Sequence, residues 1–322
     1  MTRRLGVVAA ILLLFACAPT APSLPSAPVP AGPGVAVKAE PVPLDPTDAA
    51  HVALGNFAYA GGVALTSDQT ARLHGLSDLK LTADGGFLAE SDEGDLAAGR
   101  LTLDAAGRLV GVSDVALRPL LGQNGQPLQG KLQADAEGIA VLPDGDLLVS
   151  FERDHRIWRY PAAGGPPVAA PMPQVAMPPN DGMEALAALP AVAPDAYVVG
   201  AEDESRSWIC RLSSGCVDGP ALPRPSDAGV VAVAPLGDGR IAWLFRHYSV
   251  LKGAVLTLVV LDKAGAELDR MVLSRPLTVD NFEGLAAQVR PDGKVRFYLV
   301  SDDNFSPAQR TLLLAFDWTP KP

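Results

Sequence analysis

The stretch Asn281–Phe305, NFEGLAAQVRPDGKVRFYLVSDDNF, contains the pattern from which the rest of the chain can be understood. It reads as a β-hairpin, because an apolar run is followed by the Pro-Asp-Gly turn at 291–293 and then by VRFYLV, which alternates as a strand does. Glu283 lies nine residues before Asp292, and Asp302 lies nine residues after Gly293. Positions equidistant from a hairpin turn face each other about 5 Å apart. We therefore expect Glu283 and Asp302 to share one end of the hairpin.

The same pattern recurs four more times, with turns near residues 84, 144, 195 and 238. Most copies are followed by another apolar strand, and the copies from the second to the fifth lie 46 to 53 residues apart. A repeat of this length with several strands is typical of β-propeller blades. At about 45 residues per blade, the roughly 270 residues from 51 onward give six blades. The sequence thus predicts an all-β fold, a six-bladed β-propeller with short blades of antiparallel strands. The sixth blade would combine residues 51–65 with a C-terminal strand.

Composition agrees with this fold class and limits the partners. The chain has 322 residues, of which 48% are hydrophobic, and 31 glycines and 30 prolines suit a turn-rich β protein. Its 26 basic and 36 acidic residues give a net charge of −10. This balance argues against a nucleic-acid partner, because phosphates require a basic surface. An acidic surface that binds cations is compatible with it.

The N-terminus predicts export and a lipid anchor. Arg3 and Arg4 precede an apolar segment that is too short to span a bilayer comfortably, and the segment ends in Leu-Phe-Ala-Cys at 14–17. This ending resembles the bacterial lipobox, in which cleavage precedes an acylated cysteine. We expect a signal peptide at 1–16, lipidated Cys17 with a Pro/Ala-rich tether at 17–50, and the propeller at 51–322. An ordinary cleaved secretory signal is the alternative. The predicted location is the bacterial cell envelope or periplasm, with membrane contact only through the lipid, and the protein is expected to be a monomer.

The other two cysteines flank a five-residue polar turn. Cys210 and Cys216 lie at either end of Arg211–Gly215. No further cysteine or histidine lies nearby to complete a metal site. In an oxidising compartment such a pair is expected to form a disulfide.

Acidic residues occupy the strand ends of nearly every hairpin. In a propeller the start of a blade's first strand and the end of its second lie on one face, so these residues should converge there. They are Asp92, Glu137, Glu152, Glu184, Glu202, Glu283 and Asp302. Arg246 takes the corresponding position in the fourth hairpin. Oxygen ligands without histidine or cysteine suit Ca²⁺, and Mg²⁺ less well.

We select Glu137, Glu283 and Arg246 as candidate catalytic residues, with Arg246 binding an anionic group of the substrate. Each acid also has a purely structural interpretation, in which it accepts backbone hydrogen bonds from a neighbouring blade. No G-x-S-x-G nucleophile motif, phosphate-binding loop or dinucleotide motif is present. If the protein hydrolyses anything, a metal-activated water is the more economical mechanism.

Several runs resemble the bacterial phytase-like domain family, also called the "esterase-like activity of phytase" family. They include GLSDLKLTADGGFLAESDEG, DAEGIAVLPDGDLLVSFERDHRIWRY, FRHYSVLKG and SDDNFSPAQRTLLLAF. The resemblance extends from about Gly55 to Trp318. It implies a β-propeller and a hydrolase of esters or phosphoesters. The residues that match the calcium-binding acids of β-propeller phytases are Glu137, Glu152, Glu283, Asp302 and Asp303.

Three functional hypotheses follow. The first is an exported, metal-assisted hydrolase that acts on a small anionic or ester substrate. The second is a non-catalytic envelope lipoprotein that uses the propeller face to bind a ligand or partner. The third is a lactonase of the gluconolactonase type, which Asn180, Asn281 and Asn304 keep open because such metal sites usually combine asparagine with acids.

Overall fold

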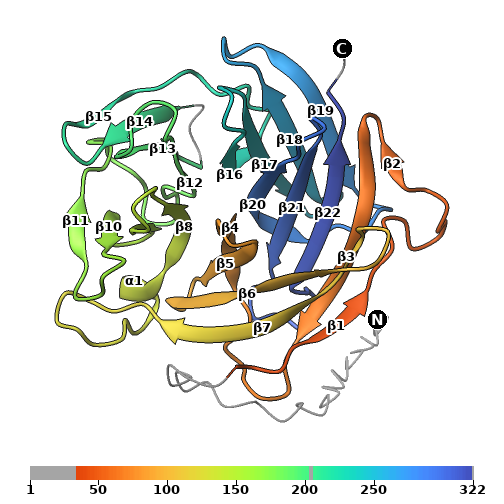
Figure 1. The fold of residues 1–322 in the computed structure, drawn as a ribbon, viewed down its shortest axis with the longest axis horizontal. Coiled ribbons are helices and arrows are strands. Elements are labelled where there is room, and N and C mark those ends of the chain that lie inside the picture. The colour runs from red at the N-terminus through yellow and green to blue at the C-terminus, as the bar shows by residue number, and fades with distance from the viewer. Residues whose placement is uncertain (1–33, 203–205, 321–322) are drawn as a thin grey trace, which may run out of the picture.

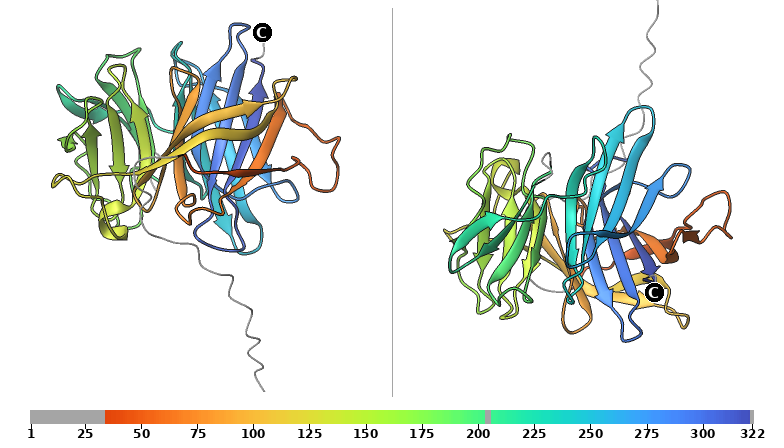
Figure 2. Two further views of the ribbon diagram at one scale, coloured as in Figure 1. Left: turned by 60° about the horizontal axis from the view of Figure 1, so that its bottom comes forward. Right: turned by 90° about the horizontal axis from the view of Figure 1, so that it is seen from above.

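The computed structural model describes residues 34–202 and 206–320. Within these residues the regular secondary structure is almost entirely β-strand, and the one helix is α1 (Lys131–Ala134). Figure 1 shows the sheets arranged around a common centre, and Figure 2 shows the same arrangement from two other directions. None of the described helices is long and apolar enough to cross a membrane.

Four groups of four consecutive antiparallel strands form successive blades, and each is called a sheet below. Three of them are separate sheets, whereas the first is joined to the last blade through a single parallel pair of Gly61 with Leu109 and so belongs to a ten-stranded sheet. The first contains β4 (Leu76–Leu81), β5 (Gly86–Ser91), β6 (Asp95–Leu103) and β7 (Leu109–Pro119). The second contains β8 (Ala136–Val141), β9 (Leu147–Phe151), β10 (Arg156–Tyr160) and β11 (Val168–Ala170). The third contains β12 (Ala185–Ala188), β13 (Ala196–Gly200), β14 (Ser207–Arg211) and β15 (Gly215–Asp218). The fourth contains β16 (Gly229–Pro235), β17 (Ile241–Ser249), β18 (Gly253–Leu261) and β19 (Glu267–Ser274).

The fifth sheet joins the two ends of the described chain. It contains β20 (Asn281–Val289), β21 (Val295–Asp302), β22 (Leu312–Trp318) and β3 (Phe57–Thr66). β22 and β3 are antiparallel, with Leu312 opposite Ala64 and Trp318 opposite Phe57. Two short strands, β1 (Lys38–Pro41) and β2 (Ala53–Leu54), also pair with β3. Backbone hydrogen bonds between segments far apart in sequence therefore complete this sheet.

The five sheets form a ring. The first strands of the sheets are β4, β8, β12, β16 and β20, and each packs against the next, with β20 returning to β4. Large buried side chains fill the space between neighbouring sheets, among them Phe297, Trp243 and Leu79. Because the sheets surround a centre with their first strands innermost, the fold is a β-propeller, as the repeat predicted.

The predicted number of six blades is not confirmed, because the described strands form five antiparallel groups, two of which join through β3 and β7. The predicted sixth blade was to use residues 51–65 and a C-terminal strand. Those two segments instead become β3 and β22, which complete the sheet that begins with β20. The first sheet also takes more chain than the average repeat suggested, since β6 and β7 are nine and eleven residues long.

The folded part begins before residue 51. β1 pairs with β3, and Val35 and Leu44 are buried. Residues from 34 onward in the segment predicted as a tether thus belong to the domain. The predicted signal peptide, Cys17 and the rest of the tether lie outside the described residues.

Candidate functional site

Two positions repeat at one end of the ring in every sheet. The first lies at the start of the innermost strand, and its residues are Ser77, Glu137, Glu184, Val231 and Glu283. Four of these five lie in a β-bulge, where the extra residue leaves the regular ladder and its side chain is re-aimed. The second lies at or just after the end of the second strand, except in the fourth sheet, where the strand continues past it, and its residues are Asp92, Glu152, Glu202, Arg246 and Asp302. We call these ten positions the acidic rim.

The acidic rim includes all seven carboxylates and the arginine that the sequence placed on one face. Six of the seven carboxylate residues are buried, and Glu202 is partly exposed. Their charges influence one another across sheet boundaries. For example, burial raises the pKa of Glu137 well above its usual value, and the nearby carboxylates of Glu184 and Glu283 raise it further. Such a concentration of acids requires neutralisation.

Arg246 neutralises the sector formed by the third to fifth sheets. Its guanidinium pairs with Glu283, donates to Glu202 Oε1 at 3.1 Å and donates to Asn281 Oδ1 at 2.6 Å. Burial lowers the pKa of Arg246, but the carboxylates of Glu283 and Glu202 outweigh this effect and raise the pKa above its usual value. The side chain is 18% exposed. Arg246 is therefore already engaged by the protein's own carboxylates.

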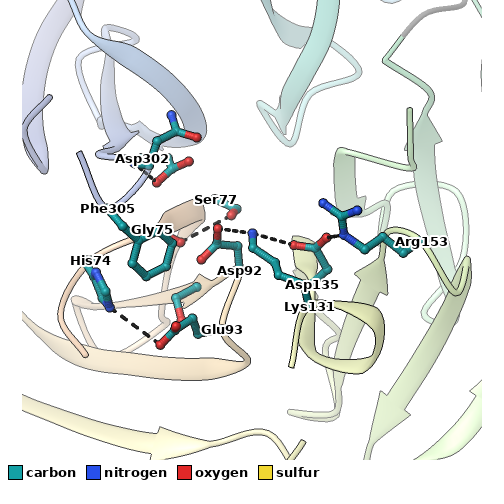
Figure 3. Close-up of polar contacts among 12 residues, drawn as sticks. His74, Gly75, Ser77, Asp92, Glu93, Lys131, Asp135, Arg153, Asp302 and Phe305 are labelled. Carbon is teal, nitrogen blue, oxygen red and sulfur yellow. Dashed lines mark hydrogen bonds and ion pairs between the residues drawn. The ribbon is translucent and has the colours of Figure 1, made fainter. Parts of the chain in front are cut away.

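Lys131, on α1, neutralises the sector between the first and second sheets. Its ammonium pairs with Asp92 and donates to Asp135 Oδ1 at 2.9 Å, and Arg153 pairs with the other oxygen of Asp135 (Figure 3). Neither Asp135 nor Lys131 was selected from the sequence. Asp135 occupies the same place in its sheet as Asn281, since the segments read DAEG and NFEG.

Three carboxylates of the acidic rim have no hydrogen bond or ion pair with any described residue: Glu137, Glu152 and Glu184. All three are buried. Burial and then the Asp135 carboxylate raise the pKa of Glu152 to about 7. One oxygen from each of Asp135, Glu137 and Glu152 lies within 4.8 Å of the others. This buried acidic triad is a set of hard oxygen ligands that could hold a metal ion.

The loop after β21 covers the edge of the acidic rim beside the first sheet. Phe305 packs edge-on against His74 with ring centroids 4.0 Å apart, next to Asp92 and Gly75 (Figure 3). Gly75 has a positive φ of 59°, and a Cβ there would lie 2.3 Å from Asp92 Oδ1. Only glycine thus allows Asp92 to occupy this position. Burial, opposed in part by Lys131, raises the pKa of Asp92 to about 6.

The asparagines considered for a lactonase-type site occupy three different environments. Asn281 donates to Glu283 Oε1 at 2.9 Å, within the acidic rim. Asn180 accepts a hydrogen bond from Arg153 at 3.0 Å. Asn304 is exposed, and its backbone N–H donates to Asp302 Oδ1 at 2.7 Å.

Two other features lie away from the acidic rim. Cys210 and Cys216 form a disulfide between the facing strands β14 and β15. The central channel opens at its other end into a mainly apolar cavity of about 560 Å³, lined by the far ends of the innermost strands, including Leu81, Val141 and Leu285. The acids and this apolar cavity therefore occupy opposite mouths of the channel.

The raised carboxyl pKa values predict an unusual pH dependence of stability in the absence of metal ions. The pKa is about 7 for Glu152 and about 8 for Asp302, where burial and then Glu283 raise it, against usual values of 4.5 and 3.8. At a pH between the usual and the raised pKa of a carboxyl group, the native state binds more protons than the unfolded state. The free energy of unfolding should therefore fall as the pH rises from about 5 to about 8. Calorimetric melting temperatures in a chelator should decrease over that range. A melting temperature that rises steadily from pH 5 to pH 8 would contradict the assignment.

Comparisons with known proteins identify one family. The model of the Phytase-like family, described as "Esterase-like activity of phytase", matches residues 71–305. No match was found among curated proteins.

Several solved structures share a broad similarity. A putative gluconolactonase is 14% identical, with 89% of this chain and 90% of that chain covered and a TM-score of 0.49. The virginiamycin B lyase of Staphylococcus aureus is 10% identical, with coverages of 88% and 100% and a TM-score of 0.43. The glutaminyl cyclase of Myxococcus xanthus is 14% identical, with coverages of 77% and 93% and a TM-score of 0.44. At these scores the similarities carry no conclusion about function.

Proposed function

The chain belongs to the Phytase-like family, and from this membership we propose that it is an exported hydrolase of small ester or phosphoester substrates, assisted by calcium at the acidic rim. One observation carries the proposal. Glu137, Glu152 and Glu184 are buried carboxylates with no hydrogen bond or ion pair to a residue of 34–202 or 206–320, and leaving such groups unpaired is costly unless they are protonated or bind a cation. The donor set contains only oxygens, which fits calcium better than zinc.

Asp135, Glu137 and Glu152 would hold the ion, because their oxygens already lie within 4.8 Å of one another. A bound divalent cation polarises an ester or phosphoryl oxygen and offsets the negative charge of the transition state. Lys131 and Arg153 fix both oxygens of Asp135. Glu184 lies beside the triad, and burial and then the Glu202 carboxylate raise its pKa well above the usual value. It would therefore hold a proton that it can donate to the leaving-group oxygen.

From the sequence, Arg246 was expected to bind an anionic group of the substrate. In this proposal Lys131 and Arg153 bind that group instead. Arg246 is 18% exposed and paired with Glu283 and Glu202. Lys131 and Arg153 have side chains that are 48% and 37% exposed. Their remaining N–H groups are accessible to a phosphate or carboxylate. Glu283 and Arg246 then act by keeping the neighbouring sector neutral and ordered.

The test measures hydrolysis and metal binding together. The full chain is assayed on p-nitrophenyl acetate, p-nitrophenyl phosphate and a lactone; it should hydrolyse one or both p-nitrophenyl esters with calcium and lose this activity in a chelator. Calcium at about 100 times its dissociation constant stabilises by about 2.7 kcal/mol, which corresponds to a rise in melting temperature of about 5–10 °C. Glu137→Gln and Glu152→Gln should remove both effects, whereas Glu40→Gln, on the exposed edge strand β1, should change neither.

The outcomes separate the three hypotheses. Turnover of only the lactone favours the lactonase. A calcium-dependent rise in melting temperature without turnover of any substrate favours the non-catalytic ligand-binding protein. If calcium changes neither stability nor activity, the metal-assisted hydrolase is wrong.

A further inference from the structure

The hairpin formed by β17 and β18 projects beyond the acidic rim. Its ladder continues from the pair Arg246–Leu256 for three more pairs, ending at Ser249–Gly253. The corresponding ladders of the first two sheets end before their rim residues, at Glu90–Leu96 and Phe151–Arg156. At about 3.3 Å per residue, the three residues after Arg246 carry the hairpin about 10 Å beyond the rim.

The tip of this hairpin is apolar and uncovered. Tyr248, Val250 and Leu251 are 69%, 95% and 92% exposed, and the exposed Lys252 follows them. At the base of the projection, His247 Nδ1 donates to the carbonyl oxygen of Asp227 at 2.6 Å. Isolated exposed apolar residues are ordinary on protein surfaces. Three at the tip of one projecting hairpin form an interaction surface.

The chain enters the fold on the same side of the ring. Lys38 in β1 lies opposite Thr66, and the adjacent Leu65 N–H donates to the carbonyl oxygen of Thr311 at 2.8 Å. Thr311 ends the loop that begins at the rim residue Asp302. The 17 residue steps from Gly34 back to Cys17 span at most about 60 Å. An acyl chain on Cys17 would therefore hold the domain close to a bilayer.

We propose that the hairpin tip at residues 248–252 inserts into a lipid bilayer and turns the acidic rim toward the lipid headgroups. Tyrosine and lysine suit the interfacial region, and Val250 and Leu251 suit the acyl region below it. Interfacial elements insert about 5–10 Å, which matches the overhang of the hairpin. The net charge of −10 favours a zwitterionic rather than an anionic bilayer. This proposal does not depend on the hydrolase assignment.

The experiment places an environment-sensitive probe on the tip. The full chain with Leu251→Cys is labelled with a nitrobenzoxadiazole dye and reconstituted into phosphatidylcholine vesicles. Cys210 and Cys216 are joined and do not react. The matched control is Val217→Cys, an exposed position on the outer strand β15. We expect emission at position 251 to rise at least twofold and shift to the blue on reconstitution, and doxyl-labelled lipids to quench it. Position 217 should show neither effect.

Vesicle flotation of the same samples reports association with the bilayer separately from insertion of the tip. Flotation without a change in emission at position 251 overturns the proposal. An emission increase that doxyl-labelled lipids do not quench also overturns it, because the tip is then covered by protein, such as a second copy of the chain. Val250→Asp together with Leu251→Asp should leave flotation through the acyl chain intact while making a probe at Tyr248→Cys insensitive to lipid.

Discussion

Replacing Asp78 with alanine should lower the free energy of unfolding more than any other single change on the innermost strands. The Asp78 carboxylate is fully buried at the centre of the ring. It accepts backbone N–H groups from its own strand, from β8 and from β20, at Leu79 (2.7 Å), Ile139 (3.1 Å) and Leu285 (3.4 Å). It also pairs with Lys80. One side chain thus connects the first, second and fifth sheets.

The expected loss is about 3–5 kcal/mol, because removing one partner of a buried ion pair leaves the other charge uncompensated. This corresponds to a melting temperature lowered by about 10 °C or more. Asp78→Ala combined with Lys80→Met should recover part of the loss, since the unpaired ammonium is then also removed. Glu40→Ala, on the exposed strand β1, is the matched control and should change stability by less than about 0.5 kcal/mol. A similar small change for Asp78→Ala would show that the three backbone contacts are not important.

The acidic rim could be predicted from sequence because the position of each acid in its blade is set by its distance in sequence from a recognisable hairpin turn. In the second sheet, Glu137 lies seven residues before Asp144 and Glu152 seven residues after Gly145. Gly145 has the positive φ of 88° that a tight hairpin turn uses. Strand ends that lie at similar distances from such turns are found at the same end of the ring. The end of the ring at which each acid lies could therefore be inferred from local sequence, without knowledge of the tertiary structure.

The number of sheets depended on a pairing that no local pattern reveals. β3 and β22 are good strands by themselves, and only their antiparallel pairing makes them parts of one sheet. The same limit applies to Asp78. The sequence offered a structural role, accepting backbone hydrogen bonds from a neighbouring blade, only for the acids of the rim. Asp78 was not identified, because its partners Ile139 and Leu285 lie in other sheets.

The acidic triad was predicted in part. Glu137 and Glu152 follow from the repeat, but Asp135 precedes the bulge and has a glycine at the corresponding position of other sheets, such as Gly75 and Gly229. The signal that could have found Asp135 is the residue at this position, which is an aspartate in DAEG and an asparagine in the matching segment NFEG. Lys131 was not predictable, because it comes from the connection between two sheets, where the repeat imposes no fixed spacing.

Arg246→Met should have the second large effect, and the size of its destabilisation should depend on calcium. Without calcium, the change removes the guanidinium that pairs with Glu283 and Glu202, and breaking such a buried pair costs about 3–5 kcal/mol. The melting temperature in a chelator should then fall by about 10 °C. Calcium should restore part of this loss, because the freed carboxylates add oxygen ligands and negative charge to the acidic rim. The rise in melting temperature on adding calcium should thus be larger in Arg246→Met than in the unchanged protein.

The matched control for this experiment is Arg270→Met, which removes a surface ion pair with Glu267 whose two side chains are both substantially exposed. Such pairs contribute about 0–1 kcal/mol, so the control should melt within about 2–4 °C of the unchanged protein and respond to calcium as it does. If Arg246→Met melts like this control in a chelator, the arginine is not needed to neutralise its sector. If it is destabilised but calcium raises its melting temperature no more than that of the unchanged protein, the carboxylates it releases are not ligands, and the cation is confined to Asp135, Glu137 and Glu152.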